Sequence, residues 1–162
     1  MPSENRKAAH MGKSAPHPTV HKIATTYLNA DPGKRIYMIR EGIDASYVDT
    51  MCTWMGTPKK SLLAMIGLSR ATIDRKISAG ARLSQNESES FLGIAKLIAM
   101  ADQIVRESGD PEGFNAAVWV AEWLSTPHPA LGGLPPGKFM DTAEGRTLVG
   151  NLLLRQQSAA FS

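Results

Sequence analysis

Basic side chains crowd into a short stretch of the 162-residue chain. Arg70, Arg75, Lys76 and Arg82 fall within thirteen residues, and Asp74 is the one carboxylate that opposes them. Guanidinium and ammonium groups clustered in this way suit phosphate oxygens and the acceptor edges of bases. The formal net charge of +3 is too common among proteins to identify a nucleic-acid partner, so the indication comes from the local cluster.

Catalytic chemistry has no comparable signal. The chain contains no G-x-S-x-G, P-loop or H-E-x-x-H motif and no cysteine–histidine pairing. His128 lies between two prolines, and there a hydrogen-bonding role is favoured over general acid–base catalysis. Trp119 and Trp123 are favoured as residues of the core over residues that stack on a ligand. Cys52, the single cysteine, indicates core filling rather than a disulfide. We therefore expect no catalytic residue, no cofactor and no metal site.

Length and hydropathy narrow the class of protein. A chain of 162 residues can bury a core as one domain of ordinary size or as two small domains packed together. The chain has no run of about 18 apolar residues and its N-terminus is polar, so we expect a soluble, cytoplasmic protein without a membrane partner. Residues 1–18 combine Ser, Pro, His, Lys and Gly, and this composition predicts a flexible basic tail.

Apolar residues at helical spacing, interrupted by capping residues, prolines and glycines, organise the rest of the chain. The expected helices cover about 20–27, 44–56, 57–67, 69–78, 84–108, 110–124 and 142–155. Four residues are expected to cap helices: Asp44, Thr57, Ser69 and Ser84. Ser84 and Glu87 form a capping box, residues 31–33 break the chain, and the proline- and glycine-rich segment 125–137 is an ordered loop. Because no alternating strand pattern appears, the predicted fold class is all-α.

The helices at 57–67 and 69–78 fit a helix-turn-helix, whose second helix lies in the major groove of DNA with its N-terminal side chains on base edges. Gly67 and Ile73 occupy the places of the usual turn glycine and buried aliphatic residue, whereas Leu63 stands where a small alanine is usual. The expected DNA-binding face comprises Ser69, Arg70, Thr72, Arg75 and Lys76. From these residues alone, a helix pair with a solvated basic face is equally favoured.

Two further motifs stand out. The first, at 80–88, is G-A-R-L-S-x-x-E-S. The second, at 123–136, is W-L-S-T-P-H-P-A-L-G-G-L-P-P, and it is followed by the expected helix start Asp141-Thr142. Together these motifs resemble the MbcA/ParS/Xre antitoxin family, and the likeness runs from about Ile36 to the C-terminus.

The resemblance implies a helical bundle with an N-terminal Xre/Cro-like helix-turn-helix and a C-terminal helical toxin-binding domain. It implies a homodimeric, non-enzymatic antitoxin whose partners are operator DNA and a RES-domain toxin, an enzyme that degrades NAD or uses it for ADP-ribosylation. In such pairs the antitoxin's C-terminal part covers the toxin's active site, and the complex represses its own promoter. We accordingly expect a tail at 1–18, a helix-turn-helix region at 19–80 and a toxin-binding and dimerisation region at 81–162.

The last helix, with the short end that follows it at 156–162, is expected to bind the toxin. Leu152, Leu153 and Arg155 fall on the family's closing L-L-x-R, and Phe161 falls where an aromatic residue is common. The expected toxin-binding residues are Leu148, Leu152, Leu153, Arg155, Gln156 and Phe161. Arg155 is the preferred residue for insertion into the toxin's pocket, because a guanidinium suits phosphate and carboxylate groups. The alternative is an ordinary surface arginine.

A stand-alone dimeric helix-turn-helix transcription regulator is the competing hypothesis. It keeps the DNA contacts and leaves the C-terminal half as a dimerisation surface. The chain departs from the family's pattern at His128, where Asn is common, and at Ala159, where Gly is usual.

Overall fold

The computed structural model describes residues 18–160; residues 1–17 and 161–162 lie outside the described part. The tail predicted at 1–18 therefore falls outside it, apart from Pro18 at the start of the first helix. The helices are α2 (Pro18–Asn29), α3 (Pro32–Glu41), α4 (Tyr47–Met55), α5 (Lys59–Met65), α6 (Arg70–Ser78), α7 (Gln85–Ser108), α8 (Ala116–Ser125) and α9 (Ala143–Ala160), with 3-10 turns η1 (Pro129–Leu131) and η2 (Pro136–Phe139). The all-α prediction is confirmed: over 18–160, β pairing is limited to one isolated bridge between Asp44 and Arg82.

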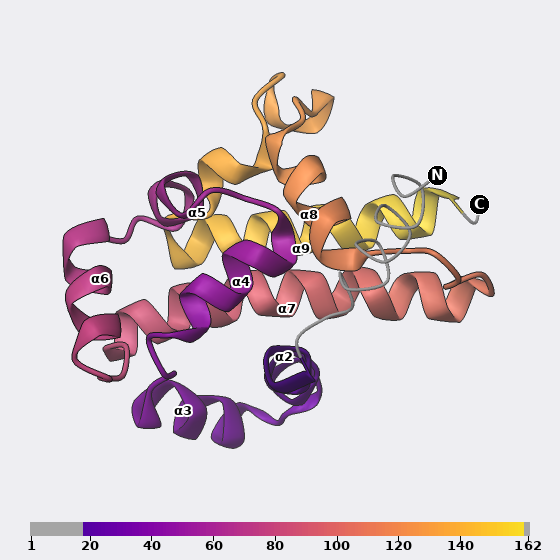
Figure 1. Cartoon of the computed structure of the whole chain (residues 1–162). Helices are drawn as coiled ribbons and strands as arrows, with labels where there is room; N and C mark the ends of the chain where they lie inside the picture. The colour runs from indigo at the N-terminus through magenta and orange to yellow at the C-terminus, as the bar shows by residue number, and fades with distance from the viewer. Residues whose placement is uncertain (1–17, 161–162) are drawn as a thin grey trace, which may run out of the picture.

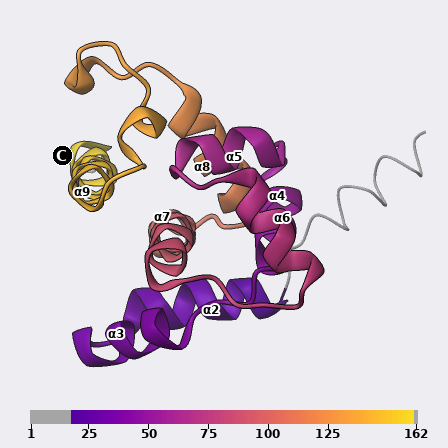
Figure 2. The same cartoon turned by 90° about the vertical axis from the view of Figure 1, so that its left-hand side faces the viewer.

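The long helix α7 is the axis around which the other helices pack (Figure 1). Helices α2 and α3 lie on one side of it, α4 and α8 on another, and α9 runs along a third (Figure 2). Most residues of α7 between Phe91 and Ala101 are buried. A helix that is apolar over more than one stripe needs such cover on several sides.

Both halves of the chain contribute to one apolar core. Val20 of α2, Met51 of α4, Leu92 of α7, Leu124 of α8 and Val149 of α9 are each at most 1% exposed and belong to the same buried cluster. Burying a side chain of this size stabilises a fold by roughly 1.5–3 kcal/mol. The N-terminal helices are therefore held to the C-terminal helices by shared packing.

Two predicted caps are confirmed. The Ser69 hydroxyl accepts a hydrogen bond from the Thr72 N–H at the start of α6. At the start of α7, the Ser84 hydroxyl accepts from the Glu87 N–H and the Glu87 carboxylate accepts from the Ser84 N–H, which completes the capping box. These caps satisfy backbone donors that the first turn of a helix leaves without partners.

Of two predicted features before α4, one is confirmed and one was wrong. Residues 31–33 break the chain between α2 and α3, and the Asp31 carboxylate also accepts from the Lys34 N–H at 2.8 Å and caps α3, a helix that the sequence prediction omitted, with Pro32 in the first turn. Asp44 does not cap a helix, because its carboxylate accepts from the N–H and the hydroxyl of Ser46. Helix α4 begins at the next residue, Tyr47.

Three later helix ends also differ from the prediction. Thr57 donates its hydroxyl to the Met55 carbonyl and does not cap α5. Helix α8 begins at Ala116 rather than near Asp110, because the Asn115 side chain supplies its cap. Helix α9 continues past 155 to Ala160, so the short end expected at 156–162 is helical as far as the structure describes it.

Candidate functional site

Helices α5 and α6 are joined by a tight turn at 66–69. The Gly67 N–H donates to the Ala64 carbonyl and the Leu68 N–H donates to the Leu63 carbonyl, which is the hydrogen-bond pattern of a Schellman helix end. Gly67 has φ +72°, a conformation that glycine adopts without cost. Leu63 and Ile73, at 1% and 0% exposure, pack the two helices onto the core. The turn therefore fixes the direction in which α6 leaves the body.

The five residues of the expected DNA-binding face lie on α6 or at its cap, but they differ in exposure to solvent. Ser69, Arg70 and Arg75 are exposed, whereas Thr72 and Lys76 are half-buried. Arg70 lies 3.6 Å from the Asp74 carboxylate on the next turn. The structure thus leaves Arg70 and Arg75 as the cations of this face that are open to solvent.

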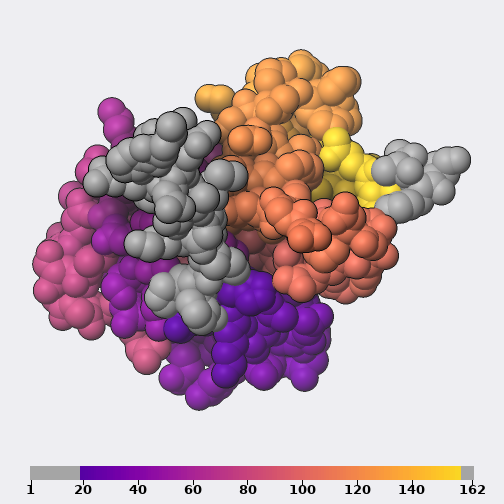
Figure 3. Space-filling model, turned by 45° about the vertical axis from the view of Figure 1, so that its right-hand side comes forward, coloured from indigo at the N-terminus to yellow at the C-terminus, as the bar shows by residue number. Residues whose placement is uncertain are grey.

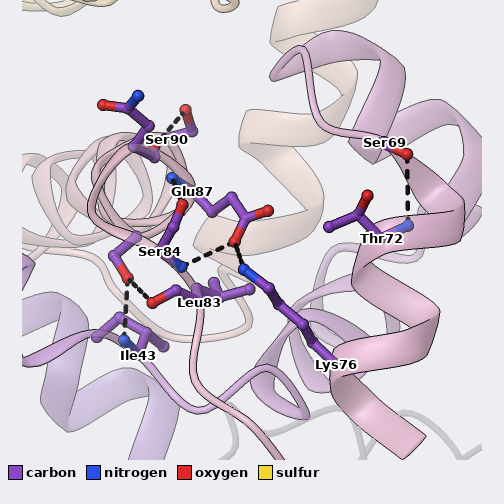
Figure 4. Close-up of polar contacts among 10 residues, drawn as sticks. Ile43, Ser69, Thr72, Lys76, Leu83, Ser84, Glu87 and Ser90 are labelled. Atoms are coloured by element: carbon purple, nitrogen blue, oxygen red, sulfur yellow. Dashed lines mark hydrogen bonds and ion pairs between the residues drawn. The ribbon is translucent and has the colours of Figure 1, made fainter.

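Lys76 is bound within the chain. Its ammonium forms an ion pair with the Glu87 carboxylate, the same group that accepts from the Ser84 N–H (Figure 4). Burial raises the pKa of Glu87, but the hydrogen bonds from Lys76 and Ser84 outweigh it and hold that pKa below its ordinary value. This pair ties α6 to the start of α7, and sequence reasoning missed it because Lys76 and Glu87 lie on different helices.

Other cations near α6 are also bound internally. Lys59 lies 2.6 Å from the Asp49 carboxylate and 2.8 Å from the Asp74 carboxylate, and these two hydrogen bonds raise its pKa. The Arg82 guanidinium donates to the Gly42 carbonyl at 2.8 Å. Lys60, which the sequence prediction omitted, is exposed on α5 and forms no ion pair with any residue in 18–160.

The loop between α8 and α9 is held in place by its own residues and stands out from the surface beside the end of α9 (Figure 3). The His128 N–H donates to the Leu134 carbonyl, and the His128 carbonyl accepts from the Gly133 N–H. The His128 ring accepts from the Ala130 N–H through Nδ1, and its Nε2 lies 2.9 Å from the Gln156 side chain of α9. The proline- and glycine-rich motif thus forms an ordered loop joined to α9.

Helix α9 packs closely against that loop. A side chain at Gly145 would collide with the Phe139 carbonyl, so only glycine permits the observed approach of α9 to η2. Along α9, Val149, Leu152 and Leu153 are buried within the chain. The helix is therefore anchored by its apolar side.

The residues expected to bind a toxin lie on different faces of α9. Leu152 and Leu153 are 4% and 3% exposed and face the body of the chain. Gln156 is half-buried at His128, and Phe161 lies outside the described residues. Leu148, at 38%, and Arg155 are exposed. They are seven residues apart and so share one face of the helix, which we call the outer face of α9.

Comparisons with known proteins bear on both surfaces. Residues 34–96 match the model of the antitoxin Xre-like helix-turn-helix domain, and residues 102–158 match that of the antitoxin Xre/MbcA/ParS C-terminal toxin-binding domain. A protein of Sphingobium sp. (strain YBL2) named "Prs ADP-ribosylating antitoxin" is 36% identical over 157 residues, which cover 97% of this chain and 95% of the relative. The chain belongs to the Xre/MbcA/ParS family of antitoxins.

Two more distant relatives support this assignment. An "Antitoxin Xre" of Yersinia enterocolitica is 27% identical over 76% of this chain and 78% of its own length, and one of Photorhabdus laumondii is 26% identical over 77% and 79%. The family predicted from the two sequence motifs is therefore confirmed. The protein is an antitoxin with a helix-turn-helix domain and a toxin-binding domain, and the second domain contains α9.

Two findings bear on other expectations. No helix within 18–160 is long and apolar enough to cross a membrane. In the same residues, no group of three His, Cys, Asp or Glu side chains is placed to hold a metal ion.

Proposed function

We propose that this antitoxin neutralises a RES-domain toxin in the cytoplasm by laying α9 over the toxin's active-site cleft. The toxin would consume NAD, either by degrading it or by ADP-ribosylating a protein, and the antitoxin itself would have no catalytic role. The match of α9 to the family's toxin-binding domain is the main support. The name of the Sphingobium relative contains the term ADP-ribosylating, which also supports an NAD-linked partner.

The outer face of α9 is the part of this domain best suited to contact a toxin. Leu148 offers apolar surface and Arg155 offers a planar guanidinium, while the opposite side of the helix is buried. Arginine is enriched at protein interfaces, and apolar surface makes up their buried centre. Leu152 and Leu153 support the helix from behind, so their part in toxin binding would be indirect.

The test is a double variant, L148D/R155E, coexpressed with the toxin encoded beside the antitoxin gene. We expect cells to lose protection, because the variant places two carboxylates on the toxin-facing surface. The matched control is I36D/R106E, which changes an exposed isoleucine of α3 and an exposed arginine of α7. Full protection by L148D/R155E would refute the proposed surface, provided that circular dichroism shows both variants folded. Operator binding by a wild-type chain that gives no protection would support the stand-alone regulator.

We further propose that the antitoxin is a homodimer that represses its own promoter by placing two copies of α6 in successive major grooves, about 34 Å apart. The exposure of Arg70, Arg75 and Lys60 around α5 and α6 supports this role. A gel shift with the promoter fragment and a light-scattering mass measurement are the tests. A monomeric mass at the concentration that saturates the operator would rule out the dimer.

A further inference from the structure

A pocket of about 500 Å³ opens between α2, α7 and α9, the last two of which lie side by side in Figure 2. None of its lining residues belongs to α5 or α6, and neither Leu148 nor Arg155 lines it. Pockets of roughly 300–1,000 Å³ with apolar walls and a few convergent polar groups are typical small-molecule sites. Leu97, Met100 and Leu154 provide apolar wall here.

Lys96 is the first polar group of this pocket. It is half-buried in the middle of α7, and no ion pair formed among residues 18–160 includes it. Burial, followed by the positive charge of Arg35, lowers the pKa of Lys96 below its ordinary value. Holding an ammonium group in such a place without a counter-ion costs free energy.

Arg146 of α9 is the second cation of the pocket. Its Nη1 donates to the Met140 carbonyl at 3.1 Å and lies 3.5 Å from the Ser90 hydroxyl. Its side chain crosses α7 at Gly93, where an added Cβ would lie 2.5 Å from the Arg146 Cδ. Gly93 is three residues before Lys96, so the Arg146 side chain crosses α7 about one turn from Lys96. The guanidinium is thus held in place before any ligand binds.

Tyr27 and Asn151 complete the polar lining near these cations. Burial raises the pKa of Tyr27 and outweighs the opposing positive charges of Arg35 and Arg146, while the negative charge of Glu89 adds to the rise. The Tyr27 hydroxyl therefore keeps its proton and can donate. The lining of the pocket therefore includes an ammonium, a guanidinium, a phenol and an amide beside an apolar wall. This combination suits an anionic oxygen group attached to an apolar body.

The carboxylates of the pocket limit the charge of such a ligand. Glu89 and Glu107 lie seven and eleven residues from Lys96 on α7, about 10 Å and about 16 Å along the helix axis. They balance the formal charges of the two lining cations, Lys96 and Arg146, and Arg35 adds one positive charge near Lys96 and Tyr27. A single excess positive charge disfavours a polyphosphate or a nucleic acid. We propose that this pocket binds a small organic carboxylate, with the carboxylate at Lys96 and Arg146 and the apolar part against Leu97 and Met100.

The test uses the full-length chain and three probes: benzoate, its neutral analogue benzamide, and inorganic phosphate. NMR titration of the backbone amides should show saturable shifts with benzoate around Gly93, Lys96 and Asn151. Benzamide should bind at least about 10-fold more weakly, since it lacks the charge that Lys96 compensates. The proposal is overturned if no saturable shift occurs, if benzamide equals benzoate, or if inorganic phosphate binds as tightly as benzoate.

Variants of Lys96 assign the effect to the pocket. Lys96→Met should weaken benzoate about 10-fold and remove its advantage over benzamide, whereas Lys96→Arg should keep that advantage. Lys60→Met, at an exposed lysine of α5, is the matched control and should bind benzoate as the wild type does. Unchanged benzoate binding by Lys96→Met would also overturn the proposal. These measurements require neither toxin nor DNA, so they stand apart from the proposed antitoxin mechanism.

Discussion

Helix α6 and helix α9 are both expected to face a partner, yet they are fixed to the body in different ways. One residue of α6, Ile73, is buried, and ion pairs through Lys76 and Asp74 hold the helix at its sides. Helix α9 is held by Val149, Leu152 and Leu153 and by the close approach of Gly145 to η2. Helix α6 thus depends on ion pairs in addition to one buried side chain, whereas α9 depends on apolar burial.

This difference matters because charges used for folding are not available for binding. Lys76 was expected to contact DNA but is paired with Glu87, and Leu153 was expected to contact a toxin but is 3% exposed. The residues left for partners are those on the opposite sides of the two helices, such as Arg75 and Leu148. Four predictions test the comparison, from the largest expected effect to the smallest.

Leu153→Ala should lower the free energy of unfolding by about 3 kcal/mol, because it leaves a cavity under α9. Leu148→Ala should change it by less than about 0.5 kcal/mol, since that side chain is exposed. Urea denaturation of both variants measures the difference. Equal effects of the two substitutions would contradict the claim that burial on one side of α9 anchors it.

Glu87→Gln should destabilise the chain by about 1–2 kcal/mol at pH 7, because it weakens the capping box and removes the ion pair with Lys76. The folded chain lowers the pKa of Glu87, so its carboxylate stabilises the fold above the unfolded pKa of about 4.3. That contribution is lost as the pH falls through the lowered folded pKa. Denaturation should therefore show a lower free energy of unfolding for the variant than for the wild type above about pH 5, and the two values should converge in stronger acid. A difference that persists in acid would show that charge is not the cause.

Arg75→Ala should reduce the slope of log affinity for operator DNA against log salt by about 1, as expected for one lost phosphate contact. Lys76→Ala should change that slope less, because its ammonium is already paired with Glu87. Fluorescence anisotropy at several salt concentrations measures both. The prediction fails if Lys76→Ala has the larger effect on the slope.

High salt should loosen α6 and leave α9 unchanged. Surface ion pairs contribute roughly 0–1 kcal/mol, and the half-buried pairs of Lys76 and Lys59 are screened in part at about 1 M salt, whereas apolar burial is not weakened. Hydrogen exchange followed by mass spectrometry should show faster exchange for peptides of 70–78 and no change for 143–157. If salt changes the exchange rates of the two segments equally, ion pairs do not hold α6 more than they hold α9.

Some features of the fold and the candidate site were predictable because they depend on residues close together in the chain. Ser69 and Ser84 act on backbone groups three residues away, and Gly67 fixes a turn of a few residues. Other local predictions failed where two local interactions compete. Asp44 bonds to Ser46 instead of capping α4, and Asn115 rather than Asp110 sets the start of α8.

The amino-acid sequence by itself determined the all-α class, the caps of α6 and α7, the helix-turn-helix and the family of the chain, because short-range hydrogen bonds and apolar periodicity depend on neighbouring residues. Only the tertiary structure decided which side of each helix is covered. It paired Lys76 with Glu87, turned Leu153 inward and left Lys96 without an ion pair among residues 18–160. These outcomes depend on how separate helices meet, since packing many side chains at once selects the exposed faces.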